Sequence, residues 1–149
     1  MGLKEQLRAD LTTAMKSRDE LRSATLRMVL TAVTNEEVSG KKARELSDDE
    51  VLKVLTREAK KRREAQEAYT QAGRSELAAR EQAEQEVIDG YLPEQMSAEE
   101  IEQLVRDAIA ETGASGPKAM GQVMRIVQPK VTGRADGAAV AAEVRRQLA

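Results

Sequence analysis

The residues of this chain that could do chemistry are mainly cations, and four of them stand in one stretch, KAMGQVMRIVQPKVTGRADG, at residues 118–137. They are Lys118, Arg125, Lys130 and Arg134, and Asp136 is the one acidic residue among them. A basic stretch with glycines is typical of a phosphate cradle, a catalytic loop or a packed elbow that docks on an acidic partner. No predicted strand precedes these glycines and the spacing GxxxxGK[ST] is absent, so the stretch does not match a nucleotide loop.

A second group of cations lies in the helix predicted to follow Ser47. Its members are Arg57, Lys60, Lys61, Arg62 and Arg63. Four consecutive residues fan around a helix and do not form a single stripe. Two interpretations stay open: a solvated helix face with Glu58 and Glu64 nearby, or a patch that contacts phosphates without reading sequence. Both groups are candidate RNA-binding residues.

Composition argues against most catalytic and metal chemistry. The chain has no cysteine and no histidine, which removes disulfides, thiolate nucleophiles, the usual general base and the commonest zinc ligand. Ser115 has no histidine to deprotonate it, and Asp136 has no partner carboxylate at helical spacing. We therefore expect no catalytic residue, no metal, no cofactor and no small-molecule substrate.

Two glutamates interrupt an otherwise apolar helical stripe. Glu81 and Glu84 fall between Leu77 and Tyr91. Bundles that hold two metal ions with carboxylates use Glu-x-x-His motifs, and this chain has no histidine to complete one. We expect these glutamates to cap a helix or to form salt bridges, with Arg57 or Arg74 as partners.

Charge is distributed unevenly along the sequence. The net charge is −2, yet residues 1–75 carry +3, residues 76–112 carry −9 and residues 113–149 carry +4. Either the charges of helical surfaces are uneven by chance, or the basic ends meet a polyanion. Because Tyr69 and Tyr91 are the only aromatic residues, RNA recognition by base stacking is close to excluded.

These side chains must be positioned by helices, because the apolar residues recur at helical spacing. Leu3, Leu7, Leu11 and Met15 form one such stripe, and no stretch alternates with period two for long enough to make a strand. Ser47 with Glu50, and Ser97 with Glu100, have the spacing of a capping box. Ser17 with Glu20 has the same spacing, Ser75 is a further expected N-cap, and Gly90 is an expected left-handed helix end.

The segment GYLPEQMS divides the chain, because Pro93 disfavours helix at Leu92. We predict an all-α protein with an N-terminal helical bundle of about four helices over residues 1–93. A small three-helix domain follows over residues 94–149. Tyr91 and Pro93 are expected to pack at the junction.

In the small domain the glycine-containing stretch is best explained by packing. Met120, Val123, Met124 and Val127 form one apolar face, and Gly121 beside them would allow a neighbouring helix to approach closely. The segment GRADG, with Gly133, turns the chain. Asp136 is expected to cap the last helix, which runs from Gly137 to Leu148.

Several of these motifs resemble the GatB/YqeY family. The pattern MGxVM followed by GRADG and a short terminal helix resembles the tail domain of GatB, the B subunit of the glutamine-dependent tRNA amidotransferase. The segments ATLRMVLTAV, ELSDDEVLKVLTREAKKRREAQEAY, AGR and YLPEQMS resemble stand-alone YqeY-type proteins, in matching order and spacing. The resemblance covers essentially the whole chain.

The resemblance implies a tRNA-contacting appendage. In the amidotransferase an amidase subunit releases ammonia and a cradle domain activates the tRNA-linked carboxylate. This chain shows neither the amidase's serine–lysine machinery nor the cradle's metal and nucleotide site. A role as a carbon–nitrogen ligase with glutamine as amido donor is therefore implied by the family label only.

We expect a non-catalytic protein that binds tRNA, or a tRNA-linked protein complex, through phosphate and shape contacts. Alternatives are a protein-interaction module that docks on a partner enzyme, an amidotransferase accessory factor, and a small enzyme that uses carboxylates and lysines. No apolar run approaches the roughly 20 residues that span a bilayer, so we expect no membrane association and a cytoplasmic location.

Overall fold

The structure is a computed structural model that describes residues 2–149. Within that range the regular secondary structure consists of seven α-helices and one short 3-10 helix, with no strand. The predicted all-α class is confirmed. The chain forms two compact units, one ending at Leu92 and the other spanning Pro93–Ala149.

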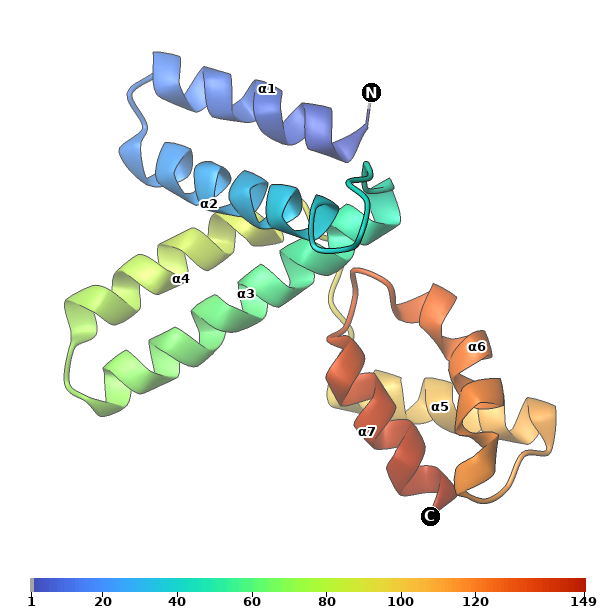
Figure 1. Cartoon of the computed structure of the whole chain (residues 1–149). Coiled ribbons are helices and arrows are strands. Elements are labelled where there is room, and N and C mark those ends of the chain that lie inside the picture. Colours follow the sequence, from blue (N-terminus) through green and yellow to red (C-terminus); the bar gives the residue numbers. More distant parts are fainter. Residues whose placement is uncertain (1) are drawn as a thin grey trace. The chain divides into compact units, whose positions relative to one another are not determined.

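The first unit contains the four helices drawn in blue to yellow-green in Figure 1. They are α1 (Leu3–Lys16), α2 (Glu20–Glu37), α3 (Asp48–Gln71) and α4 (Ser75–Asp89). Helix α2 contacts each of the other three, and α3 with α4 forms a long helical hairpin. The order of these helices along the chain therefore brings α1 and α2 together as one pair and α3 and α4 as another.

Aliphatic side chains fill the core of this unit. Leu7, Leu26, Val29, Leu55 and Ile88 are all essentially inaccessible to solvent. They come from all four helices, so burial of their apolar surface holds the four helices together. Met15 departs from the expected α1 stripe, since its side chain is exposed at the end of the helix.

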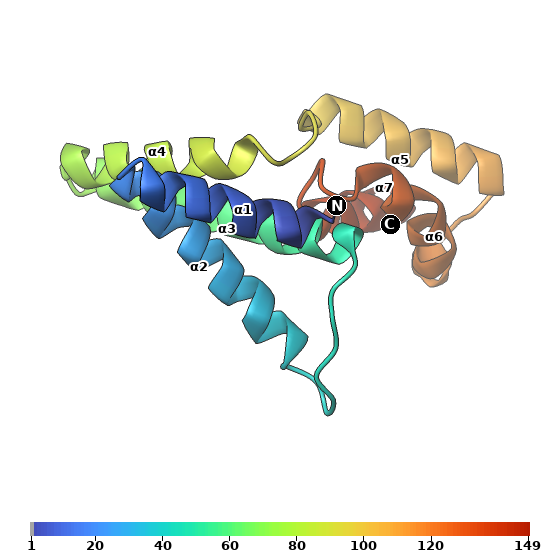
Figure 2. The ribbon, with the colours of Figure 1, turned by 90° about the horizontal axis from the view of Figure 1, so that it is seen from above.

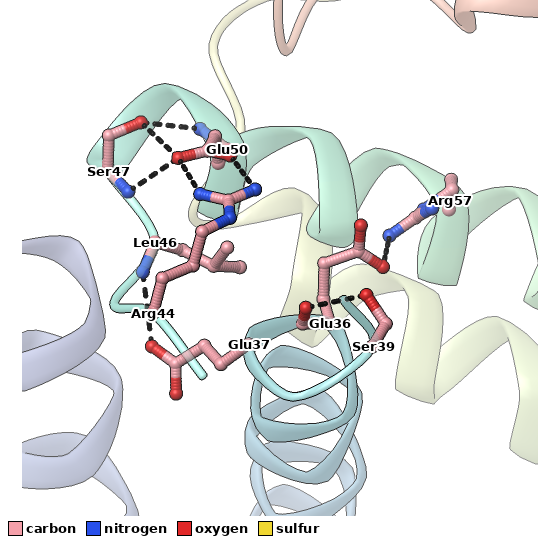
Figure 3. Close-up of polar contacts among 8 residues, drawn as sticks. All are labelled: Glu36, Glu37, Ser39, Arg44, Leu46, Ser47, Glu50 and Arg57. Carbon is pink, nitrogen blue, oxygen red and sulfur yellow. Dashed lines mark hydrogen bonds and ion pairs between the residues drawn. The ribbon is translucent and has the colours of Figure 1, made fainter. Parts of the chain in front are cut away.

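Two of the three predicted capping boxes are confirmed. The Ser47 hydroxyl accepts a hydrogen bond from the Glu50 N–H, and the Glu50 carboxylate accepts one from the Ser47 N–H (Figure 3). Ser97 and Glu100 make the same reciprocal pair before α5 (Ala98–Thr112). Each box satisfies two backbone donors that would otherwise lack partners.

The helix caps predicted at Ser17 and Ser75 are wrong. Ser17 lies past the end of α1, and the side chain that caps α2 is Asp19, which accepts from the Arg22 N–H at 3.1 Å. Ser75 is already the first residue of α4, and no side chain caps that helix.

Gly90 does not adopt a left-handed conformation. Its φ is −61°, in the right-handed region. The chain continues beyond it in a tight turn, since the Tyr91 N–H bonds Ile88 O at 2.9 Å and the Leu92 N–H bonds Asp89 O at 3.1 Å. Because these bonds extend the helical winding, the backbone never needs the conformation that glycine alone adopts easily.

The connection between α2 and α3, residues 38–47, is mostly exposed and runs out beyond the end of α2 (Figure 2). Two contacts hold its far end in place. Arg44 forms an ion pair with Glu50, and the Leu46 N–H donates to Glu37 (Figure 3). The Leu46 side chain is buried in the core. The loop is therefore anchored where it enters α3.

The second unit contains α5, the short 3-10 helix η1 (Pro117–Ala119), α6 (Met120–Val131) and α7 (Gly137–Leu148). The helices α5, α6 and α7 each contact the other two (Figure 1). Their core is almost entirely small and aliphatic, with Val105, Val123, Val127, Val140 and Val144 fully buried.

Turns with left-handed glycines connect these helices. Gly113 has a φ of 65° at the end of α5, and Gly133 has a φ of 75° after α6. The Asp136 side chain accepts from the Ala138 N–H and caps α7. The GRADG segment therefore positions α6 and α7 relative to each other.

None of the described helices combines the length and the apolar character that crossing a bilayer requires.

Candidate nucleic-acid interface

The segment that forms η1 and α6 in the second unit presents three cations without acidic partners. Lys118 lies in η1, and Arg125 and Lys130 lie in α6; all three are exposed. Within the described part of the chain, none of the three makes a side-chain hydrogen bond or an ion pair. Their charges are therefore available to a partner outside the chain.

The local sequence explains why these cations stay free. Helix α6 buries Val123, Val127 and Val131, so at 3.6 residues per turn Arg125 faces away from the core. Residues 112–135 contain no aspartate or glutamate. A carboxylate one turn away, the usual partner of a helical cation, is thus missing throughout α6.

Arg134 differs from the other three. Its side chain is half-buried, its Nε donates to the carbonyl of Glu94 at 2.9 Å, and its guanidinium lies 4.0 Å from Glu100. Its own carbonyl accepts from the Met96 N–H. Arg134 therefore fastens the GRADG turn to the segment before α5, which is a structural task.

Gly121 does not serve the purpose predicted from the sequence. It lies on the exposed side of α6, and a Cβ built on it would meet no atom within 4 Å. No neighbouring helix approaches it, because α5 and α7 pack on the side of α6 that carries Val123 and Val127. Met120 and Met124 border that packed side and are half-buried against the core, whereas Gly137 begins α7 at the surface.

Most of the cations predicted on α3 have acidic partners within the chain. Arg57 pairs with Glu36 at 3.2 Å (Figure 3). Lys61 pairs with Glu58 at 3.1 Å, with its side chain 69% exposed. Lys60 is half-buried, and Arg63 is exposed. Of the predicted α3 group, Arg63 is therefore the cation most open to a phosphate.

Arg62 must be withdrawn as an RNA-contacting candidate, because it is buried. Its residue is 8% exposed, and its guanidinium lies 3.0 Å from Glu58 and 3.5 Å from Glu84. Its position explains this: it falls seven residues after Leu55, on the inward stripe of α3. Two carboxylates that are themselves buried neutralise the charge there.

The predicted partners of the α4 glutamates are also wrong. Glu84 pairs with Arg62 and with Arg80, not with Arg57 or Arg74. Arg74 pairs instead with Glu76, and Arg57 is engaged elsewhere. Glu81 is half-buried nearby, and burial together with the charge of Glu84 raises the pKa of its carboxyl.

Sequence reasoning missed a polar cluster around Tyr91. The Tyr91 hydroxyl donates to the Asp10 carboxylate, and it accepts a hydrogen bond from Arg22 at 3.2 Å. Burial and the neighbouring Asp10 raise the pKa of Tyr91 to about 12. Nothing in local spacing signals this cluster, because Tyr91 lies 81 positions from Asp10.

A metal site is not found among the described residues. Residues 2–149 hold no group of three or more aspartates and glutamates placed to bind a metal ion. Ser115 is exposed in the loop before η1. The polar arrangements described above are ion pairs, helix caps and the hydrogen-bonded cluster around Tyr91.

Comparison with known proteins places the chain in a family. The family model described as "Yqey-like protein" matches residues 4–148. A protein of Pyrenophora tritici-repentis named "Altered inheritance of mitochondria protein 41, mitochondrial" is 30% identical over 133 residues, covering 87% of this chain and 71% of that protein.

A protein of the same name from Lachancea thermotolerans is 29% identical over 113 residues, covering 74% of this chain and 60% of its own length. A Schizosaccharomyces pombe protein without a functional name is 32% identical over 97 residues, covering 64% and 76%. None of these names states a reaction. The chain belongs to the YqeY-like family, in agreement with the resemblance of its motifs.

Proposed function

We propose that this protein is a non-catalytic accessory factor that binds tRNA, or a protein complex carrying tRNA. The binding surface is the exposed side of η1 and α6, with Lys118, Arg125 and Lys130 as its charged contacts. Phosphates and backbone shape are recognised, since the second unit has no aromatic residue on which bases could stack.

One observation carries this proposal: these three cations have no acidic partner within the described chain, whereas the α3 cations are largely paired. A charge already held by a carboxylate must lose that partner before it binds a phosphate, so it contributes little net affinity. Free charges contribute fully by releasing counterions from the nucleic acid.

The spacing of the three cations suits a nucleic-acid backbone. Arg125 and Lys130 lie five residues apart on α6, about 7.5 Å along its axis at 1.5 Å per residue, and Lys118 lies just before this helix. One strand of a DNA duplex presents a phosphate about every 3.4 Å along its axis, so the two α6 cations lie about two phosphates apart.

Gly121 supports the same surface. It lies one turn before Arg125 on the exposed side, with open space around it. A glycine here lowers helix stability relative to alanine by about 0.5–1 kcal/mol without a packing reason inside the unit. In our proposal its missing side chain lets a phosphodiester backbone lie directly against α6.

A link to amide transfer rests on the family resemblance. An accessory factor would present tRNA to an amidotransferase without holding the active site, and no residue here is proposed as catalytic. The expected cytoplasmic location stays a prediction beside relatives whose names contain the word mitochondrial. Arg63 is retained as a secondary phosphate contact on the first unit.

The experiment is a titration of fluorescently labelled bulk tRNA with the full-length protein and with K118E/R125E/K130E. Arg134 is left unchanged, because its contact with Glu94 fastens a turn. The matched control is K41E/K42E/K53E, which reverses three exposed cations of the first unit and gives the same net charge. Loss of binding in the first variant alone supports the proposal, whereas equal loss in both variants contradicts it.

A further inference from the structure

A groove of about 390 Å³ lies between α1 and α2 on the surface of the first unit. Its lining residues come from these two helices only: Arg8, Leu11, Arg27, Leu30, Thr31 and Thr34, with Asn35 beside them. None of its lining residues belongs to the η1–α6 surface proposed for tRNA.

The charges of the groove have one sign. Arg8 and Arg27 are exposed, no aspartate or glutamate lines the groove, and neither arginine forms an ion pair within the described residues. Arg27 donates only to the sulfur of Met15 at 3.1 Å, a weak acceptor.

Arg8 is also left without a carboxylate of its own. It contributes to lowering the pKa of Glu37, but the main causes of that lowering are the hydrogen bonds that Glu37 accepts from Lys4 and from the Leu46 backbone. Both guanidinium groups therefore keep donors for an anionic partner. Arginine binds carboxylates in a bidentate manner especially well.

Two leucines add apolar surface to a lining that is otherwise polar or charged. Leu11 and Leu30 both line the groove and are half-buried. Met15 lies outside the lining but touches Arg27, and it is 44% exposed. Exposed methionine adapts to varied apolar partners.

We infer that the α1–α2 groove docks an acidic amphipathic segment of a partner protein. Carboxylates of the segment would pair with Arg8 and Arg27, and its apolar side chains would cover Leu11, Leu30 and Met15. The leucines beside the arginines favour a peptide over a nucleic acid, because phosphates gain nothing from contact with leucine and methionine. In this proposal the segment binds as an amphipathic helix.

The probe is a short fluorescent helical peptide, with leucine at every third or fourth position and glutamate elsewhere. Its binding to the full-length protein is measured by anisotropy. We expect R8E/R27E to weaken binding at least about tenfold. T34W, which fills the groove without changing charge, is expected to weaken binding as well.

Three results would overturn the inference. One is the absence of peptide binding at low salt. Another is an equal loss in K53E/R145E, which reverses two exposed cations outside the groove, since that would reveal only general charge attraction. The third is a duplex RNA that loses as much affinity as the peptide in R8E/R27E. Circular dichroism of each variant checks that the helices are retained.

Discussion

Arg62 and Glu84 face each other across the α3–α4 hairpin, with Arg62 Nε 3.5 Å from Glu84 Oε2 and both residues less than one-tenth exposed. Glu58 supplies a second carboxylate at 3.0 Å, and the Arg62 guanidinium also contacts the sulfur of Met28. We expect this pair to fix the register of α3 against α4, because sliding of one helix along the other would separate buried charges.

Removal of the Arg62 side chain should lower the stability of the protein strongly. In R62A the buried carboxylates of Glu58 and Glu84 lose their shared counter-charge, although Lys61 and Arg80 still reach one each. We expect the free energy of unfolding to fall by about 3 kcal/mol. Urea denaturation of the full chain measures this value.

R57A is the matched control on the same helix. The Arg57–Glu36 pair is largely exposed, so its loss should cost at most about 1 kcal/mol. Similar costs for R57A and R62A would contradict the structural role assigned to the buried pair.

The phenol of Tyr91 should ionise at a higher pH than that of an ordinary tyrosine. Burial and Asp10 raise the pKa of its phenol to about 12, from an ordinary value of 10. In Y69F, where Tyr91 is the remaining tyrosine, the ultraviolet absorbance of tyrosinate should therefore appear near pH 12. Adding D10N should move the titration towards pH 10, because a negative neighbour is removed.

The same shift predicts how stability depends on pH. The folded state favours the protonated phenol, so this contribution is fully present below pH 10 and is lost as pH rises towards 12. The stability of Y91F should fall less than that of wild type across this interval. Parallel alkaline losses in the two proteins would count against the Tyr91–Asp10 contact.

Helix caps give a third test. S47A should cost about 1 kcal/mol, since the Glu50 N–H loses its acceptor at the start of α3. D19A should cost a similar amount at the start of α2. S17A should change stability by less than about 0.5 kcal/mol. A larger loss of stability in S17A than in D19A would contradict the Asp19 cap and support the predicted capping box of Ser17 and Glu20.

A substitution at Gly121 should change stability and tRNA binding in opposite directions. G121A should raise the stability of α6 by about 0.5–1 kcal/mol, because alanine is the better helix former and has free space there. If a phosphate backbone lies against this glycine, the same variant should bind tRNA more weakly. Thermal unfolding and tRNA titration on one preparation measure both. Unchanged or tighter tRNA binding would show that nothing approaches α6 at this position.

Local signals in the sequence were sufficient for the helices but not for their contacts. The capping boxes at Ser47 and Ser97 and the apolar stripe of α6 depend on residues within one turn, and they were predicted. The four consecutive cations of α3 suggested an exposed helix surface, yet Arg62 follows the buried Leu55 by seven residues and is itself buried. Helical periodicity along α3 therefore predicts the burial of Arg62 better than the run of cations does.

Contacts between distant segments could not be predicted in the same way. Arg62 meets Glu84, and Tyr91 meets Asp10, only because the helices pack as they do. The openness around Gly121 likewise depends on which side of α6 the other helices cover. Such facts belong to the packing of the helices, so no pattern within a single helix reveals them.

The most direct test of the proposed function is the salt dependence of tRNA binding by the full-length protein. Three phosphate contacts predict a log–log slope of about −2.1 to −2.7, a loss of about 20- to 40-fold in affinity between 50 and 200 mM salt. K130Q should reduce the slope by about one. No binding at low salt, or a slope that K130Q leaves unchanged, would contradict phosphate recognition by the η1–α6 surface.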